Sequence, residues 1–211
     1  WEIIKNLVRS VLAAWDKPDR SIWEFRTRKM HFVFSKVMSW VAVDRASLIA
    51  ELLHRDSYAE KWRRKADMIK AEVHEKGWSE ELQCFTQAYG NTDYDSSLLL
   101  MQFYDFIEPD NERYVKTVKA IKEHLYHEGL MYRYKAEDDF GVPTSSFTIC
   151  TFWLIEALFK IGETEEAREI FEKMISYSNH LGLYSEDLDF KTKRQLGNFP
   201  QAYSHLAFIN T

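Results

Sequence analysis

The short stretch "SIWEFR" places Glu24 directly between two large aromatic residues, Trp23 and Phe25. Enclosure by aromatic rings keeps water away from a carboxyl group and favours its protonated form near neutral pH. A carboxyl group in that state can act as a general acid, so Glu24 is a candidate proton donor. The alternative is a loop glutamate that forms an ion pair with Arg26 or Arg28. Spacing alone leaves both interpretations open.

A second carboxylate would complete the chemistry of glycoside hydrolysis, in which one group protonates the leaving oxygen and the other acts as base or nucleophile. Three later segments combine acidic with aromatic residues, a composition that suits the apolar faces and hydroxyl groups of sugars. The residues do not choose among the candidates, and Asp93, which precedes a predicted helix, could simply be an N-cap. The candidates are Glu80, Glu81, Asp93, Asp95, Glu137, Asp138, Asp139, Glu186, Asp187 and Asp189.

Signals for other chemistry are weaker. His124 and His127 have helical i,i+3 spacing, but no carboxylate completes a metal-site pattern, so surface histidines are the preferred interpretation. Cys84 and Cys150 lie far apart and are interpreted as small buried hydrophobic residues. The stretch "NTDYDSS" lacks the glycine and the distal glutamate of an EF-hand loop. No P-loop, GxSxG or dinucleotide fingerprint is present, and neither a metal nor a cofactor is predicted.

Composition indicates a folded globular protein. The chain has 211 residues, of which 45% are hydrophobic and 15% aromatic, with a formal charge of -5 from 28 basic and 33 acidic residues. That balance argues against nucleic acid as the main partner, and "KWRRK" is interpreted as a solvated helix face. No apolar run is long enough to span a membrane. The first residues are already helical and lack a methionine, so the compartment is left open, with the cytoplasm favoured.

Apolar residues recur at helical spacing along most of the chain, which predicts an all-α protein. Short connections follow the second, fourth and sixth predicted helices, whereas long aromatic and acidic loops follow the first, third, fifth and seventh. Short turns make neighbouring helices antiparallel, so the long loops are expected on one face, where a binding site would lie. The predicted helices span residues 2–15, 31–54, 56–75, 93–106, 111–127, 145–161, 164–177 and 198–210.

Four loops, taken together and in order, resemble the glucoamylase family of glycoside hydrolases, which includes trehalases of that type. The matching segments are "IWEFR" with "HFVFSKVMSWVAVDRA", "RYKAEDD" with "FTICTFWLIEAL", "GLYSEDLD", and "LGNFPQAYSHLAFI". The resemblance implies an (α/α)6 toroid of twelve helices, of which this chain would supply helices five to twelve. Residues 1–211 would then be one portion of a catalytic domain, without the first four helices and any β-sandwich domain.

The resemblance also implies roles for individual residues. Glu24 matches the family's general acid and Glu186, in "YSEDLD", its general base. Hydrolysis would then proceed with inversion, and the two carboxyl groups would lie about 6.5 to 9.5 Å apart. Arg133 would bind substrate hydroxyl groups. The other residues expected at the substrate are Trp23, Arg26, Glu137 and Phe147, with Asp138 beside them.

Two departures from the family pattern put the substrate in doubt. Phe25 replaces a second glutamate of fungal members, and Thr144, Ser145 and Ser146 stand where acidic or glycine residues are expected in the bacterial type. The expected activity is release of terminal α-linked glucose from oligosaccharides or trehalose. The alternative is a non-catalytic α/α carbohydrate-binding or scaffold fragment. An incomplete toroid would expose apolar flanks, which favours a homo-oligomer or a complementing N-terminal segment.

Overall fold

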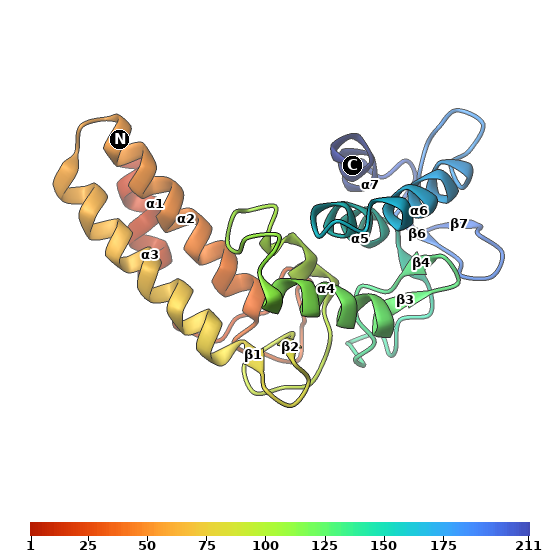
Figure 1. The fold of residues 1–211 in the computed structure, drawn as a ribbon, viewed down its shortest axis with the longest axis horizontal. Helices are drawn as coiled ribbons and strands as arrows, with labels where there is room; N and C mark the ends of the chain where they lie inside the picture. The colour runs from red at the N-terminus through yellow and green to blue at the C-terminus, as the bar shows by residue number, and fades with distance from the viewer. The chain divides into compact units, whose positions relative to one another are not determined.

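The computed structural model describes residues 1–211, and its internal contacts divide the chain into two compact units (Figure 1). Unit 1 comprises Trp1–Thr92 and Tyr104–Phe106, and unit 2 comprises Asp93–Phe103 and Ile107–Thr211. Both units consist of helices and of strands only two residues long. The prediction of an all-α protein is therefore confirmed.

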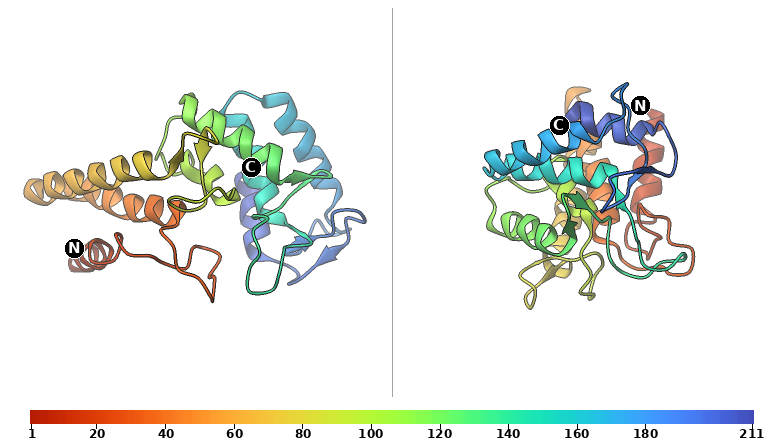
Figure 2. Two further views of the ribbon diagram at one scale, coloured as in Figure 1. Left: turned by 90° about the horizontal axis from the view of Figure 1, so that it is seen from below. Right: turned by 90° about the vertical axis from the view of Figure 1, so that its right-hand side faces the viewer.

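Unit 1 is built on an antiparallel pair of long helices, which run side by side in the different views of Figures 1 and 2. Its core lies between them, where Trp40 and Val43 of one helix and Trp62 and Ile69 of the other are almost completely buried. A short hairpin follows the second long helix. The elements are α1 (Glu2–Leu12), α2 (Val33–Leu52), α3 (Asp56–Lys76), β1 (Trp78–Ser79) and β2 (Cys84–Phe85).

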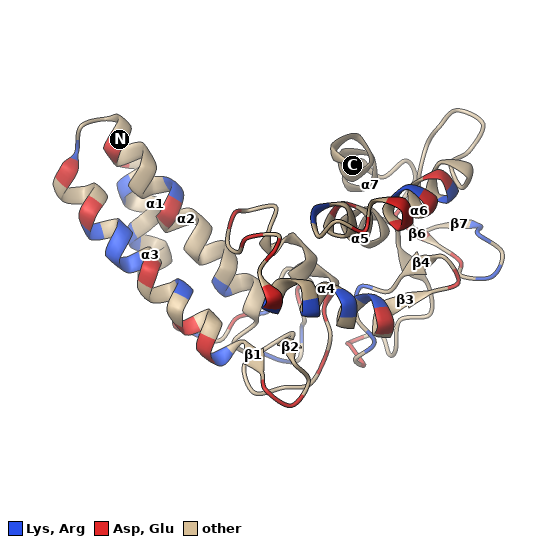
Figure 3. Cartoon of the chain, in the orientation of Figure 1, with Lys and Arg blue, Asp and Glu red and all other residues tan.

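The two long helices differ in character. Half of the residues of α2 are buried, and its one buried acidic residue, Asp44, accepts hydrogen bonds from Arg45 and Arg63. The exposed face of α3 instead carries Lys, Arg, Asp and Glu along its length (Figure 3). An apolar face with an opposite charged face is typical of a helix that packs on one side only. The "KWRRK" segment thus lies on a helix with a solvated face, as the sequence predicted.

Unit 2 centres on α5, a helix that is buried along most of its length and packs against the helices next to it. The turn from this helix into the next one contains Gly162 at φ +90°, a conformation that glycine adopts without steric cost. The helices are η1 (a 3-10 helix, Ser96–Met101), α4 (Glu112–Leu125), α5 (Thr148–Lys160), α6 (Thr164–Ser176) and α7 (Ala202–Asn210).

Short strands tie the long loops of unit 2 to one another. β3 (Tyr126–His127) pairs with β4 (Leu130–Met131), and a three-stranded antiparallel sheet follows the order β5-β6-β7. In this sheet, Ser146 of β5 lies opposite Leu188 of β6, and Phe147 lies opposite Asp187. The strands are β5 (Ser146–Phe147), β6 (Asp187–Leu188) and β7 (Gln195–Leu196). The third and fourth long loops therefore come together, as expected for loops of one face.

The predicted helix over residues 93–106 is wrong in type and length, because only the 3-10 helix Ser96–Met101 forms there. Asp95 accepts hydrogen bonds from the backbone N–H and the hydroxyl group of Ser97. The backbone N–H of Ser96 donates to Arg133 O at 2.9 Å, and its hydroxyl donates to Tyr132 O. Asp and Ser side chains that bond nearby backbone groups compete with α-helical hydrogen bonding. The chain then turns at Asp105, where φ is +58°.

The other predicted helices form, with ends that shift by a few residues. The sixth and eighth begin later than predicted, at Thr148 and Ala202, because the residues before them belong to the loops around β5 and β7. Asn111 caps α4 by accepting a hydrogen bond from the backbone N–H of Arg113. None of the helices combines the length and the apolar character that a membrane span requires.

Candidate active site

Glu186 in unit 2 is fixed by its backbone at the start of β6. Its N–H donates to Asn198 O at 2.9 Å, and its carbonyl oxygen accepts from the N–H of Thr148, the first residue of α5, at 2.9 Å. Two segments that are far apart in the sequence therefore hold the peptide groups of this residue. The position of the Glu186 Cα is set by the sheet and by the N-terminus of a buried helix, and not by a free loop.

The carboxylate of Glu186 is held at one oxygen only. Its Oε2 accepts a hydrogen bond from the backbone N–H of Asn198 at 3.1 Å and another from Asn198 Nδ2 at 2.9 Å. No hydrogen bond from the chain reaches Oε1, and the side chain is partly exposed. A carboxylate fixed in this way presents its second oxygen to solvent or to a bound molecule.

Gly197 lies against the same carboxylate. Its φ is +72°, and a Cβ atom at this position would lie 2.8 Å from Glu186 Oε2 and 3.1 Å from the Glu186 Cβ. A side chain at residue 197 would therefore displace the carboxylate or break its bonds to Asn198. Both the backbone conformation and the available space restrict this position to glycine.

Asp187, the residue after Glu186, is partly buried, and its carboxylate is hydrogen-bonded. Its Oδ2 accepts a hydrogen bond from the hydroxyl of Ser145 at 2.5 Å. Burial raises the pKa of Asp187, and the charge of Glu186 adds to this, while Ser145 and Arg133 oppose it. Ser146, the residue after Ser145, donates a hydrogen bond to Leu188 O at 2.9 Å. The two serines thus connect the segment before α5 to the strand that follows Glu186.

Arg133 is part of a second group of polar side chains. Its Nη2 donates to Asp138 Oδ2 at 2.7 Å, and the hydroxyl of Tyr134 donates to the same oxygen at 2.8 Å. The other oxygen of Asp138 accepts from the N–H of Phe140 at 2.7 Å. Burial works against the charge of Asp138, but these bonds outweigh it and lower the pKa. Asp138 therefore acts as the residue that orients Arg133.

The remaining expected substrate residues of unit 2 lie in the same two loops. Phe147 is half-buried on β5, opposite Asp187, and thus close in register to Glu186. Glu137 is exposed and precedes Asp138, which begins the turn that Asp138 and Gly141 close by mutual backbone hydrogen bonds. The structure therefore brings Phe147 and Glu186 onto hydrogen-bonded segments, and the charge of Arg133 acts on Asp187 in the same sheet.

Glu24 in unit 1 has different surroundings. It lies in a loop at φ +56°, its N–H donates to Ser21 O at 3.2 Å, and its side chain is exposed. Phe25 instead is 2% exposed and stacks on Phe32 with ring centroids 5.3 Å apart. The expected enclosure of Glu24 by both aromatic side chains is therefore wrong: the turn directs Phe25 into the core and Glu24 outwards. Trp23 is half-buried.

Residues that the sequence analysis did not consider hold this loop. Asp19 and Met30 exchange backbone hydrogen bonds at its base, and Arg20 Nη1 donates to Phe25 O at 2.8 Å and also to Arg26 O. Arg26 is exposed. The guanidinium group of Arg28 lies 4.0 Å from the centre of the Phe25 ring. The backbone that carries Glu24 is thus held by a closed base, a buried ring and a cation that binds two carbonyl groups.

A buried lysine supports the base of the loop. Lys36 on α2 is 1% exposed, and its Nζ donates to Lys17 O at 2.6 Å and lies 3.5 Å from Asp19 Oδ2. Burial lowers the pKa of Lys36, and the charge of Asp19 opposes part of that shift. The sequence offers one signal for this supporting role of Lys36, which is its position among apolar residues of α2. The first and second long loops also meet, since Val33 N donates to Gln87 O at 2.9 Å.

Other candidate carboxylates have structural tasks. Asp95 is 2% exposed and caps η1, and Asp189 accepts from the N–H groups of Lys191 and Thr192 in a tight turn. Glu80 and Glu81 are exposed around the turn between β1 and β2. His124, a metal candidate of low priority, stacks on Tyr94 with ring centroids 3.9 Å apart. Asp95 and Asp189 are thus bound to groups of their own local turns, whereas Oε2 of Glu186 is bound by a residue of another segment.

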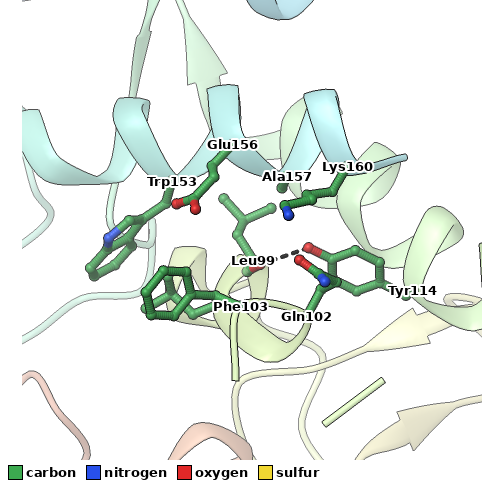
Figure 4. A pocket seen from close by; sticks show the side chains of 9 residues that line it. Leu99, Gln102, Phe103, Tyr114, Trp153, Glu156, Ala157 and Lys160 are labelled. Carbon is green, nitrogen blue, oxygen red and sulfur yellow. Dashed lines mark hydrogen bonds between the residues drawn. The ribbon is translucent and has the colours of Figure 1, made fainter. Parts of the chain in front are cut away.

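Two cavities of unit 2 lie away from these residues. A cavity of about 10 Å³ lies between η1 and the C-terminal half of α5, where Tyr114 donates to Leu99 O at 2.7 Å (Figure 4). Burial raises the pKa of Glu156, which lines this cavity. The space holds about one water molecule and is too small for a sugar. A larger groove of about 440 Å³ beside α4 and α6 is lined by Lys119 and Glu163, which already form an ion pair.

The arrangement of helices matches solved structures of α/α toroids. A bacterial glucoamylase in complex with acarbose superposes with a TM-score of 0.82 over 98% of this chain and 36% of that chain, at 16% sequence identity. Identity at that level establishes the fold alone. The chain therefore adopts part of the (α/α)6 toroid fold, as predicted.

Sequence comparison identifies the family. The model of the glycosyl hydrolases family 15 matches residues 1–211, and the chain belongs to this family. It is 44% identical to a trehalase of Mycolicibacterium smegmatis over 100% of its own length and 32% of that protein. A trehalase of Mycobacterium tuberculosis is 43% identical, with 100% and 31% covered. The chain thus spans about a third of the length of the curated relatives that it matches.

Proposed function

We propose that this chain is the part of a trehalose-hydrolysing enzyme that carries both catalytic carboxyl groups, with Glu24 as general acid and Glu186 as general base. The observation that carries the proposal is the 44% identity to a trehalase across the whole chain, which includes the loops of both residues. Terminal α-linked glucose on oligosaccharides is the other substrate class, since a structure of similar fold was solved with acarbose. Units 1 and 2 are, in this proposal, parts of one catalytic domain.

The proposed reaction inverts the configuration at the anomeric carbon. Glu24 gives its proton to the glycosidic oxygen while the bond from that oxygen to the anomeric carbon breaks. Glu186 takes a proton from a water molecule, and the oxygen of that water forms the new bond on the opposite face of the ring. The free Oε1 of Glu186 and the outward position of Glu24 support these roles, because both groups can reach a bound molecule.

Side chains around the two carboxyl groups would bind the sugars. Arg133, oriented by Asp138, offers guanidinium N–H groups to hydroxyl groups, and Glu137 offers acceptors at the edge of the same loop. Phe147 and Trp23 are half-buried rings on which the apolar face of a pyranose can stack. Arg26 is exposed next to the Glu24 loop and would contact the leaving sugar.

Two further expectations remain proposals. Apolar residues are exposed on the outer helices, for example Ile3 and Leu7 of α1 and Leu206 and Ile209 of α7. We propose that further polypeptide, either a complementing N-terminal segment or a second copy, covers these residues in the active enzyme. A cytoplasmic location is proposed as well, in keeping with two free cysteines, Cys84 and Cys150.

A substrate panel tests the proposed function. The longest polypeptide that the gene encodes is purified and incubated with trehalose, maltose, maltotriose and isomaltose, and released glucose is measured. We expect trehalose to give the highest kcat/KM. Preference for maltotriose would move the proposal to the oligosaccharide class. Absence of glucose from all substrates with a folded protein would favour the alternative, a non-catalytic carbohydrate-binding or scaffold module.

A further inference from the structure

We propose that Asn198 is the positioning residue of the general base: it binds Glu186 Oε2 twice and so assigns Oε1 as the atom that takes the proton from water. This inference rests on the proposed function, because it presumes that Glu186 is the base. It concerns a residue outside the predicted site, within a stretch that was expected to be helical.

The geometry around Glu186 Oε2 carries the inference. The backbone N–H of Asn198, at 3.1 Å, and its side-chain amide, at 2.9 Å, both donate to this oxygen. The backbone of the two residues is also paired, since Glu186 N donates to Asn198 O at 2.9 Å. One residue therefore fixes the peptide group and one carboxylate oxygen of the base. The position of Oε2 is then fixed, and Oε1 accepts no hydrogen bond within the chain.

Gly197 makes this attachment possible. Because a Cβ at residue 197 would lie 2.8 Å from Glu186 Oε2, the carboxylate occupies the space of the missing side chain. The positive φ of Gly197 also turns the chain so that the next N–H faces the carboxylate. The pair of Gly197 and Asn198 thus forms a small receptor for one carboxylate oxygen.

Fixing one oxygen has a chemical consequence. In the inverting reaction, the base must take its proton from a water molecule that sits in line with the breaking bond, and a small displacement of either atom slows the step. A glutamate that rotates freely offers either oxygen in many orientations. Asn198 removes that freedom, and the proton of the water then moves to Oε1 while Oε2 keeps its two hydrogen bonds.

The charged groups near Glu186 are few. Asp187 is its neighbour on β6 and repels it, and Arg133, from the loop before β5, interacts favourably with Asp187. The residues that face Glu186 from the other elements, Thr148 of α5 and Gly197 and Asn198 before α7, are neutral. Neutral donors therefore orient the carboxylate without forming an ion pair with it.

Two substitutions of Asn198 test whether donation or shape matters. Asn198→Ala removes the side-chain donor and leaves the backbone N–H. Asn198→Asp keeps the shape but replaces the donor by a carboxylate. We expect kcat on trehalose to fall about tenfold or more for Ala, with KM changed less than about twofold, and at least as far for Asp.

A matched pair of glycine substitutions provides the control. Gly197→Ala places a Cβ against Glu186, whereas Gly182→Ala has nearly the same backbone strain, with φ +74° against +72°, but no atom within 4 Å. We expect Gly197→Ala to lose activity at least as strongly as Asn198→Ala. Gly182→Ala should reproduce only the loss of thermal stability. Equal activity of the two glycine variants would overturn the proposal.

The outcomes separate this inference from the proposed function. Glu186→Gln is measured alongside, in the same polypeptide. If Glu186→Gln abolishes turnover while Asn198→Ala and Asn198→Asp keep the wild-type kcat, Asn198 does not position the base. A wild-type rate for Asn198→Asp alone would show that shape suffices and would also overturn it. If Glu186→Gln itself is fully active, the proposed function fails before the role of Asn198 arises.

Discussion

The surroundings of Glu24 in unit 1 and of Glu186 in unit 2 differ in what is held fixed. Around Glu186, the side chain itself is bound, with two hydrogen bonds from Asn198 to one carboxylate oxygen. Around Glu24, only the backbone is bound: Arg20 donates to the carbonyl groups of Phe25 and Arg26, and Phe25 anchors the loop in the core. The Glu24 carboxylate has no hydrogen-bond partner within the chain.

This difference fits the two proposed tasks. A base that activates water must be ionised and oriented before the water arrives, and hydrogen-bond donors achieve both. An acid must hold a proton and release it to the leaving oxygen, so donors aimed at its charged form would work against it. A loop that places the backbone and leaves the carboxyl group to the substrate meets that need. The two carboxyl groups are thus supported by different means.

The largest expected effect comes from removing either carboxyl group. We predict that Glu24→Gln and Glu186→Gln each lower kcat on trehalose by about a hundredfold to ten-thousandfold, because each removes an acid or base function. Thermal unfolding should change little for Glu24→Gln, since nothing in the chain binds that side chain. For Glu186→Gln a small loss of stability is expected, because the Gln amide can still accept from Asn198.

These two variants test whether Glu24 and Glu186 have the proposed roles. A rate near that of the wild type for either one, measured as glucose release under saturating trehalose, would remove that residue from its role. The matched control is Glu137→Gln, an exposed carboxylate in a neighbouring loop of unit 2, which should alter KM more than kcat.

An intermediate effect is expected from Arg20, which supports only the backbone around Glu24. Arg20→Ala should lower kcat about tenfold, because loosening the loop spreads the positions of the acid. Arg9→Ala is the control, since Arg9 is an exposed arginine of unit 1 that bonds only Asn6. If both variants retain full kcat, Arg20 does not position Glu24. The proposal that the acid is positioned through the backbone of its loop is then wrong.

Helical periodicity predicted the helices and the loops, but not what local side chains do to them. The 93–106 segment has helical spacing, yet the side chains of Asp95 and Ser96 bind backbone groups, and only a short 3-10 helix forms. Asn198 lies within a predicted helix, but α7 begins only at Ala202, and the freed residue binds Glu186. The bonds of Ser96 to Tyr132 and of Asn198 to Glu186 join different segments of the chain, so no local sequence pattern predicts them.

The site was predicted in part. The family resemblance pointed to Arg133, Phe147 and Glu186, which unit 2 does bring onto neighbouring segments. Ser145 and Ser146 depart from the family pattern, which left the substrate open, and in the structure they bind Asp187 and Leu188 and hold the sheet beside Glu186. The enclosure of Glu24 failed because a positive φ turns consecutive side chains in directions that spacing does not reveal.

The smallest expected effect is on the pH dependence of folding stability, which should differ between Asp187 and Asp189. Burial, and to a smaller extent the charge of Glu186, raise the pKa of Asp187 above its ordinary value of 3.8, so its charge costs stability in the folded state as pH rises through that range. Hydrogen bonds from Thr192 lower the pKa of Asp189, which therefore contributes stability that is lost as pH falls below 3.8.

Two Asn substitutions should consequently show opposite pH dependences. Near pH 7, Asp187→Asn is expected to unfold at a higher temperature than the wild type. This difference in melting temperature should shrink near pH 3. Asp189→Asn should show a deficit near pH 7 that shrinks on acidification. Melting temperatures across this pH range measure both, and parallel curves for the two variants would contradict the difference in their environments.

The configuration of the released glucose tests the central claim, that Glu24 and Glu186 form an inverting pair, most directly. Proton NMR follows the anomeric signals in the first minutes of trehalose hydrolysis, before mutarotation. Inversion at one anomeric carbon gives one β-glucose and leaves the other glucose in its α form, so the account predicts equal initial amounts of both anomers. Initial formation of α-glucose alone would indicate retention and contradict it.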